Sequence, residues 1–416
     1  MKFIHNKQAF KTTFLFTLAL YVTQSFGISA EDLTEKLNLT GVLSLENTTS
    51  YPTEGQLFFK NSHERIISNN YQQLRLITEG EATKNSNYEF HFTSTNQHQN
   101  MDNRSTSSIN LYRAKSLKHQ TIKESGTSNY NSWAQEIDRA NVTINLTDLR
   151  FKIGRQPISW GTGRFWQPLD VFGAFAATDI EREYKPGIDL VSADYYPSHL
   201  SSLSLIYVFS PRDNSVIKDS QGAIYQTQLG ENSSVSIMLS NISSNKVGGG
   251  SFETDWLDIG WRIEGTIFEE FDSSKKSAYF IAGIDYQLKN ETSISAEYYF
   301  NRSGASTSQE LEKLTSSTLI LSGLQKQLSE QLLGLSLQNT VTPLITLNYT
   351  LLTAYLSGFE ISTLHQFSGI ISLGNESDLR LSLLLTSGEK LDDNKIPQSE
   401  FGHIPLGVTL KYKLYF

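Results

Sequence analysis

The chain has 416 residues, a net charge of −8 at pH 7 and no cysteine, which excludes a disulfide scaffold, thiol chemistry and a cysteine-borne lipid anchor. Hydrophobic residues make up only 38%, and no apolar run of about 18 residues follows the N-terminus, which excludes a bundle of membrane helices. The acidic balance, without a dense cluster of lysine and arginine, argues against nucleic acid as a partner.

Residues 1–30 have the pattern of a secretory signal peptide. Three lysines precede the apolar stretch 12–22, and small residues favour cleavage after Gly27 or Ala30. The remaining residues, 31–416, are expected to form a single domain exported towards the outer membrane of a Gram-negative bacterium.

Short segments of alternating apolar and polar residues fill most of the mature chain, which favours β-strands. In the stretch 257–267, Ile263 and Ile267 lie on one face and Arg262 and Glu264 on the other. Charges recur on one face only, and aromatic residues reach 11%, as expected for a barrel with a lipid-facing wall and a wet interior. We therefore expect an all-β fold, a transmembrane antiparallel β-barrel of the bacterial outer-membrane type, with about 18 strands (16 remaining possible). A soluble β-barrel or sandwich would alternate in the same way.

Two stretches complicate the strand count. The candidate strands near Ser107 and Asn131 are weakly patterned, and Gly248-Gly249-Gly250 reads as a flexible turn between strands. Counting strands from both termini puts the long loop 158–186 on the periplasmic side, where turns are normally short. Either this loop is exceptional or the count is wrong by one strand.

The loop 158–186 departs from the alternation and carries two tryptophans, two arginines and four acidic residues. Pro157 ends strand pairing because it has no N–H, and Gly161 and Gly163 permit backbone conformations closed to larger residues. A loop of this length commonly folds into a lumen or closes a mouth. Its charges are expected to form a selective constriction or ion pairs that pin the loop to the wall, and the two roles do not exclude each other.

The candidate residues of a constriction or solute path are the charged residues of this loop and of the inward strand faces. They are Arg139, Arg150, Lys152, Arg155, Arg164, Asp170, Arg182, Glu183, Arg262, Glu264, Asp285 and Glu297. No catalytic, metal or cofactor site is expected, because no histidine lies in a catalytic-looking segment and no cluster has zinc spacing.

The last eleven residues, Leu406–Phe416, alternate strictly and end on an aromatic residue. This length matches a tilted membrane-spanning strand of roughly 9–11 residues. Tyr412, Leu414 and Phe416 would face lipid and resemble the signal read by the barrel-assembly machinery.

The stretches 138–172, DRANVTINLTDLRFKIGRQPISWGTGRFWQPLDVF, and 282–301, AGIDYQLKNETSISAEYYFN, together with Gly187-Ile188-Asp189, resemble porin-like outer-membrane proteins related to the alginate-export channels. The resemblance implies a monomeric barrel of about 18 strands that passes solutes. An arginine-lined tube suits a polyuronate, whereas the lumen inferred for this chain mixes both signs of charge.

These patterns predict an outer-membrane channel for small hydrophilic or charged solutes, in contact with membrane lipid and lipopolysaccharide. A structural or adhesive barrel with a blocked lumen is the alternative, and a barrel enzyme is a weaker one. The sequence does not identify the solute, the direction of transport or the oligomeric state.

Overall fold

The computed structural model describes residues 38–416 except 58, 60–65, 101–111, 126–128, 174, 176, 178–181, 213–216, 270, 272–275, 315–316, 322 and 357–359. The expected signal peptide, residues 1–30, and the candidate strand start near Ser107 therefore lie outside the described residues.

β-strands make up most of the described chain, which has almost no helix. These are β1 Leu39–Tyr51, β2 Ile67–Thr83, β3 Ser86–Gln99, β4 Lys118–Ser125, β5 Asn129–Asn145, β6 Leu149–Gln156, β7 Ile188–Ser198, β8 Ser201–Val208, β9 Ser220–Leu229, β10 Ser233–Ile242, β11 Asn245–Trp256, β12 Ile259–Glu269, β13 Lys276–Gln287, β14 Thr292–Asn301, β15 Gln331–Thr342, β16 Ile345–Leu356, β17 Glu360–Gly374, β18 Ser377–Ser387 and β19 Leu406–Tyr415. Two short helices, α3 Ser308–Leu314 and α4 Thr318–Leu321, lie between β14 and β15. No helix in the described ranges is long and apolar enough to cross a membrane.

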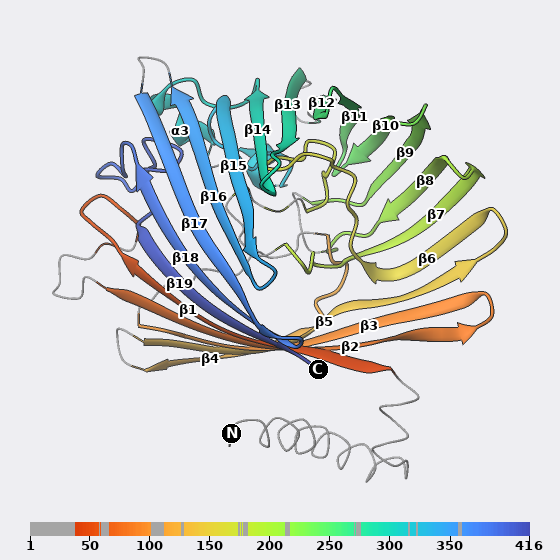
Figure 1. The fold of residues 1–416 in the computed structure, drawn as a ribbon, viewed down its shortest axis with the longest axis horizontal. Helices are drawn as coiled ribbons and strands as arrows, with labels where there is room; N and C mark the ends of the chain where they lie inside the picture. Colours follow the sequence, from red (N-terminus) through yellow and green to blue (C-terminus); the bar gives the residue numbers. More distant parts are fainter. Residues whose placement is uncertain are drawn as a thin grey trace, which may run out of the picture.

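The strands close into an 18-stranded antiparallel barrel that matches outer-membrane porin structures. Figure 1 shows how the strands surround the interior. The last strand, β19, pairs with β1 along ten residue positions and so closes the ring. Nineteen strands form only 18 positions around the barrel, because β4 and β6 share one side of β5. β4 pairs with residues 129–136 of β5, and β6 pairs with residues 140–145. The expected fold class is thus confirmed.

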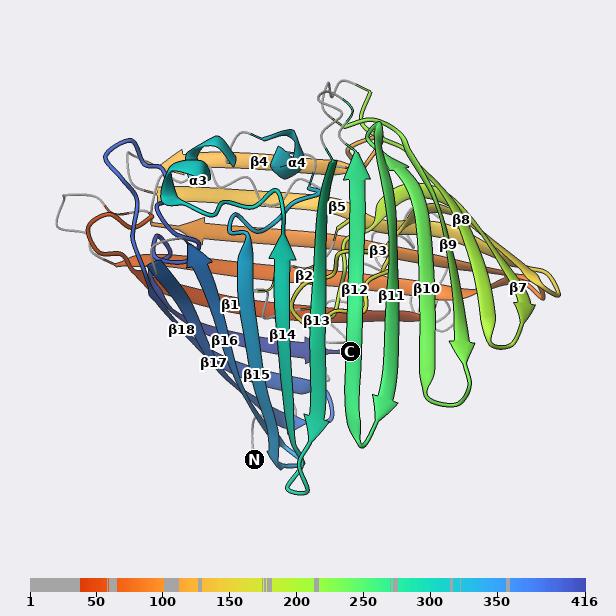
Figure 2. The same cartoon turned by 90° about the horizontal axis from the view of Figure 1, so that it is seen from above.

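The two ends of the barrel differ in their connections (Figure 2). At one end, the short-turn end, eight turns of two to four residues join the strands: 84–85, 146–148, 199–200, 230–232, 257–258, 288–291, 343–344 and 375–376. At the other, the long-loop end, the connections include 52–66, 157–187, 209–219, 302–330 and 388–405. The commonest two-residue hairpin turn requires positive φ angles at both turn residues. Leu257 and Asp258 have such angles.

Two corrections follow for the strand count. The reading of Gly248-Gly249-Gly250 as a turn is wrong, because these glycines lie inside β11 and pair with both β10 and β12. In addition, β3 pairs directly with β5, so no full strand lies between them. With these changes, the loop 158–186 starts from the long-loop end and not from the end with the short turns.

The alternation correctly separated the two faces of the wall. On β12, Ile263 is 58% exposed on the outside, whereas Glu264 is fully buried on the inside. Arg262 is likewise buried and Ile267 exposed. Charged side chains point inwards because a charge costs about 2–4 kcal/mol on the lipid side at mid-depth.

The C-terminal residue completes the closing seam between β19 and β1. The N–H of Phe416 donates to the carbonyl of Gly41 (N···O 3.0 Å), and the N–H of Gly41 donates to the carbonyl of Phe416 (2.8 Å). A Cβ added to Gly41 would lie 2.4 Å from the ring atom Cζ of Phe416, so this glycine leaves the space that the ring occupies.

Deletion of Phe416 should therefore reduce the amount of folded barrel in the outer membrane. It removes both hydrogen bonds and about 1.5–3 kcal/mol of side-chain burial at the seam. Heat-modifiability of membrane fractions on gels measures the folded amount, and single-channel recording checks the barrels that do assemble. Normal folded levels would contradict a role in assembly, whereas normal conductance at a reduced level is the expected result.

Candidate functional site

The segment 157–187, called here the lumen segment, leaves the wall after β6 and runs through the interior of the barrel before β7 begins (Figure 1). Pro157 ends the pairing of β6. The segment then turns its aromatic and aliphatic side chains towards the wall. Trp160, Phe165, Trp166, Leu169 and Phe172 are buried in one cluster with inward-facing residues of many strands, among them Ile224, Met238, Ile281 and Leu332.

A glycine run in the wall provides the space for the tip of the lumen segment. A Cβ added to Gly249 would lie 2.7 Å from Cδ2 of Leu169 and 2.7 Å from Cγ2 of Thr266. Leu169 has no exposed surface at all. Gly249 is therefore a socket for the segment, and the three glycines lie in a paired strand and not in a flexible connection.

Glu264 of β12 anchors the lumen segment through its carboxylate. It accepts hydrogen bonds from the N–H of Thr162 (2.6 Å), the hydroxyl of Thr162 (2.8 Å) and the N–H of Leu169 (2.6 Å). These bonds satisfy backbone donors of an irregular segment that has no sheet partner.

Glu297 of β14 is a second anchor. Its carboxylate accepts from the N–H groups of Arg164 (2.9 Å), Phe165 (3.1 Å) and Trp166 (2.9 Å). The tight backbone curve that presents these three donors requires Gly163, because an added Cβ would lie 1.7 Å from the carbonyl oxygen of Trp166. Glycine alone fits this position.

Lys185 links the end of the lumen segment to its middle, through an ion pair, and to its start, through a hydrogen bond. The ammonium of Lys185 donates to Asp170 and to the carbonyl of Ile158, and both charged side chains are buried. Burial raises the pKa of the Asp170 carboxyl, and the Lys185 ammonium opposes that shift. The pair therefore fixes the path of the segment rather than offering charge to a solute.

The last residues of the lumen segment reach the opposite wall. Glu183 forms an ion pair with Lys413 of β19 (2.5 Å), and the guanidinium of Arg75 lies 4.4 Å from the ring centre of Tyr184. Contacts on β12, β14 and β19 together mean that the segment spans the interior from one side to the other.

A second group of predicted residues forms a paired cluster on β3, β5, β6 and β7. Arg155 is buried and donates from Nε and Nη2 to the carboxylate of Asp189 (2.7 and 3.0 Å). Glu89 accepts from Arg139 (2.7 Å) and pairs with Lys152 (3.3 Å). Arg150 donates to the side chain of Asn145 and lies over the ring of Tyr196, near the short-turn end. None of these four basic residues lines the cavity described next.

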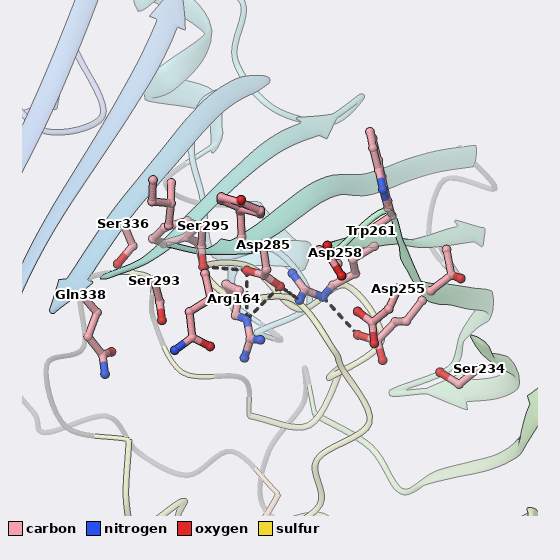
Figure 3. A pocket seen from close by; sticks show the side chains of 18 of the residues that line it. Arg164, Ser234, Asp255, Asp258, Trp261, Asp285, Ser293, Ser295, Ser336 and Gln338 are labelled. Carbon is pink, nitrogen blue, oxygen red and sulfur yellow. Dashed lines mark hydrogen bonds and ion pairs between the residues drawn. The ribbon is translucent and has the colours of Figure 1, made fainter. Parts of the chain in front are cut away.

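A cavity of about 980 Å³ lies beside the lumen segment, towards the short-turn end. The wall contributes mostly hydroxyl and amide side chains, such as Ser295, Gln338 and Asn348. Arg164 and Arg182 border it from the segment, and Asp255, Asp258 and Asp285 from the strands and turns. Figure 3 shows Arg164 and the three aspartates. The side chain of Arg164 is 58% exposed and touches Asp285 only at 3.4 Å, so its guanidinium is open to solutes in the cavity.

Arg262 and Asp285 also line this cavity but belong to a dense network. Arg262 pairs with Asp285 and with Glu253 (3.1 Å), and lies 3.6 Å from the carboxylate of Glu297. Asp285 also accepts from the hydroxyl of Ser295 (2.6 Å). The network holds the Glu297 anchor in place, which makes Arg262 a structural residue as well as a cavity residue.

The structure thus divides the twelve predicted site residues into three groups. Arg164, Arg182, Arg262 and Asp285 meet at the cavity; Asp170, Glu183, Glu264 and Glu297 position the lumen segment; and Arg139, Arg150, Lys152 and Arg155 lie in or near the cluster around Glu89 and Asp189. The predicted site residues did not include the acidic partners Glu89 and Asp189. They also did not include Asp138, which pairs with Arg75 and Arg113. The only sequence signal for such pairs is that each lies on the charged face of an alternating strand. Within the described ranges, no group of three or more histidine, aspartate or glutamate residues could hold a metal ion.

No known family model matches the chain, and no curated protein sequence is similar to it. Among solved structures, OccK9 (OpdG) of Pseudomonas aeruginosa has a TM-score of 0.57 at 8% identity, covering 91% of this chain and 97% of that chain. OccD3 (OpdP) of the same organism has a TM-score of 0.54 at 10% identity, with 91% and 90% covered. OccAB1 of Acinetobacter baumannii has a TM-score of 0.54 at 8% identity, with 91% and 96% covered.

At these identities, the likeness establishes the fold: a closed 18-stranded antiparallel barrel that matches outer-membrane porin structures. The comparisons do not show a link to the alginate-export family, so that resemblance stays a prediction.

Proposed function

We propose that the protein is an outer-membrane channel for small hydrophilic solutes, with the lumen segment as its constriction. The observation that carries the proposal is the polar cavity of about 980 Å³ that opens beside an inward-folded segment with an exposed arginine. A polar path of this kind suits a hydrated solute, and transport along it needs no chemical step on the solute.

The proposal assigns the short-turn end to the periplasm and the long-loop end to the cell exterior, as in other barrels of this type. The cavity is then a periplasmic vestibule, and the lumen segment lies between it and the exterior. We further propose a location in the outer membrane of a Gram-negative bacterium, reached through the expected signal peptide at residues 1–30, and a monomeric protein in contact with membrane lipid.

Selectivity in this proposal resides in the charges that face the cavity. Arg164 offers a guanidinium at the constriction, whereas Glu231, Asp255 and Asp258 lie on the walls and turns below it. Arg182 donates to the carbonyls of Arg164 and Ala177 and supports the shape of the segment. Because the side chain of Arg164 is 58% exposed, we expect it to contribute to the charge that a solute meets at the constriction.

Replacement of Arg164 by alanine should shift the channel towards cations. The change removes the exposed guanidinium but leaves the backbone N–H of residue 164 bonded to Glu297. Reversal potentials of single channels in a tenfold KCl gradient measure the shift. Arg302→Ala, an exposed arginine in a long loop and away from the cavity, is the matched control. Equal reversal potentials for wild type and Arg164→Ala would remove Arg164 from the solute path.

A barrel with a blocked lumen is a second candidate function, favoured by the close packing of the lumen segment. Leu169, Trp166 and Phe165 are buried in a hydrophobic cluster that joins the segment to the wall and to residues of the long loops such as Phe401. Planar-bilayer recording of the purified protein separates the candidates. Steady single-channel current supports the channel, and silence under all solutes supports the blocked barrel.

A further inference from the structure

The outward face of β1, β2, β3 and β5 changes character partway along each strand. Towards the short-turn end it is apolar, with Leu45, Leu74, Phe92 and Ile137 as the last apolar residues. Towards the long-loop end, each strand continues for three more outward positions. These twelve residues, called here the polar face, are Asn47, Thr49, Tyr51, Ser68, Asn70, Gln72, Ser94, Asn96, His98, Asn131, Trp133 and Gln135.

The border of the polar face runs oblique to the strands. Leu45 pairs with Gln72, so the polar residues begin one position earlier on β2 than on β1. Leu74 pairs with Ser94, so the border moves again by one position on β3. A flat membrane surface that crosses strands tilted by roughly 35–45° gives such steps. The polar face therefore lies outside the lipid tails, at the long-loop end.

Hydrogen bonds arrange the side chains of the polar face into one surface. Asn47 donates to Asn70 (2.8 Å) and to Ser68 (3.1 Å), and the ring of His98 contacts the amide oxygen of Asn131 (2.5 Å). The indole N–H of Trp133 donates to Ser94 on β3 (3.1 Å), and 49% of this tryptophan is exposed. The bond ties the ring to the neighbouring strand while one large aromatic surface remains open.

The composition of the polar face selects a class of partner. None of its twelve residues is aspartate, glutamate, lysine or arginine, and none is aliphatic; at its border, β4 sets His119, Thr121 and Lys123 opposite Gln135, Trp133 and Asn131. Acyl chains need an apolar surface, and phosphate groups need guanidinium or ammonium donors. Amides and hydroxyls, which both donate and accept hydrogen bonds, match sugar hydroxyls, and an open indole provides an apolar plane for the C–H side of a sugar ring.

We propose that the polar face binds the neutral core sugars of lipopolysaccharide in the outer leaflet around the barrel. The inference rests on the proposed location in the outer membrane but not on conduction. The sugars must lie next to the membrane, because the polar face borders directly on the lipid-facing apolar residues of the same four strands.

The test is binding of lipopolysaccharide to the full-length mature protein in detergent, measured by surface plasmon resonance. Two probes are compared: lipopolysaccharide with a complete core, and lipid A without core sugars. For Trp133→Ala, the affinity for the complete-core probe should fall on the order of tenfold, a change of about 1.4 kcal/mol. Its affinity for lipid A should be unchanged. Trp256→Ala, which alters an exposed tryptophan at the short-turn end, should bind both probes like the wild type.

Three outcomes would overturn the inference. Trp133→Ala could bind both probes like the wild type, or it could lose affinity for lipid A as strongly as for the complete core. A dimer of the wild type that dissociates in Trp133→Ala by sedimentation would instead assign the face to a second copy of the chain. Because the assay needs no current, a silent bilayer recording would refute the channel and leave the sugar result standing.

Discussion

Replacing Glu297 by leucine should release the lumen segment from the wall and raise the single-channel conductance. The carboxylate is the acceptor for three backbone N–H groups, those of Arg164, Phe165 and Trp166. Leucine is similar in size and has no acceptor. A buried donor left unpaired costs roughly 1–3 kcal/mol, so the docked segment would lose about 3–9 kcal/mol. If the segment leaves the wall, water can bond to the three N–H groups and that cost is avoided. The constriction is then lost.

Planar-bilayer recording measures this effect, and cleavage of the segment by an added protease reports undocking independently. Glu297→Gln keeps one acceptor oxygen, so its conductance and its rate of cleavage should lie between those of the wild type and of Glu297→Leu. Asp258→Asn is the matched control, because this carboxylate lines the same cavity but does not touch the lumen segment in the described part of the chain. If Glu297→Leu conducts like Asp258→Asn and resists the protease equally, the anchor is not what holds the constriction.

The sequence was sufficient to predict the wall of the barrel. Strict alternation placed Glu264 and Glu297 inside and Ile263 outside, because a charged side chain towards lipid is costly whatever the register of the strands. The same reasoning predicted that the stretch after Pro157 leaves the wall. These inferences depend on neighbours in the chain, and such neighbours are visible in a sequence.

The role of the two anchors was not predictable in the same way. Glu264 and Glu297 were expected to face a solute, yet each bonds to backbone donors more than ninety positions earlier in the chain. A backbone N–H has no sequence signature, so such a partner cannot be read from residue types. Asp170 was likewise expected to face a solute but is paired with Lys185. Both residues lie in an irregular segment, where the sequence gives no alternation from which to predict a pairing.

The glycines of β11 show a third kind of limit. A run of three glycines lacks alternation, and glycine is weakly suited to strands, so a turn was the natural reading. The middle glycine, Gly249, is explained by Leu169, which occupies the space left by its missing side chain. The residue that explains the pattern is eighty positions away, and the pattern marks a close approach rather than a bend.

Replacing Gly249 by valine should therefore displace the lumen segment. The new Cβ would lie 2.7 Å from Leu169, 2.7 Å from Thr266 and 2.7 Å from the carbonyl of Gly265, so neither the segment nor the wall has room for it. Overpacking of this kind costs roughly 1–3 kcal/mol. The segment yields first, since it is held at its tip by Leu169 and two carboxylates, whereas the wall is bonded on both sides of β11.

Hydrogen exchange of the backbone amides of Thr162 and Leu169 measures this displacement, since both donate to Glu264 in the docked segment. Exchange should accelerate on the order of tenfold for each 1.4 kcal/mol of lost docking energy. Gly248→Val is the matched control, because it makes the same change one position along the strand, on the outward face, where the nearest atom to an added Cβ is 3.7 Å away. Valine favours strands at both positions equally, so any difference between the two variants reports the socket for Leu169. Equal exchange in the two variants would mean that Gly249 is not needed to dock the lumen segment.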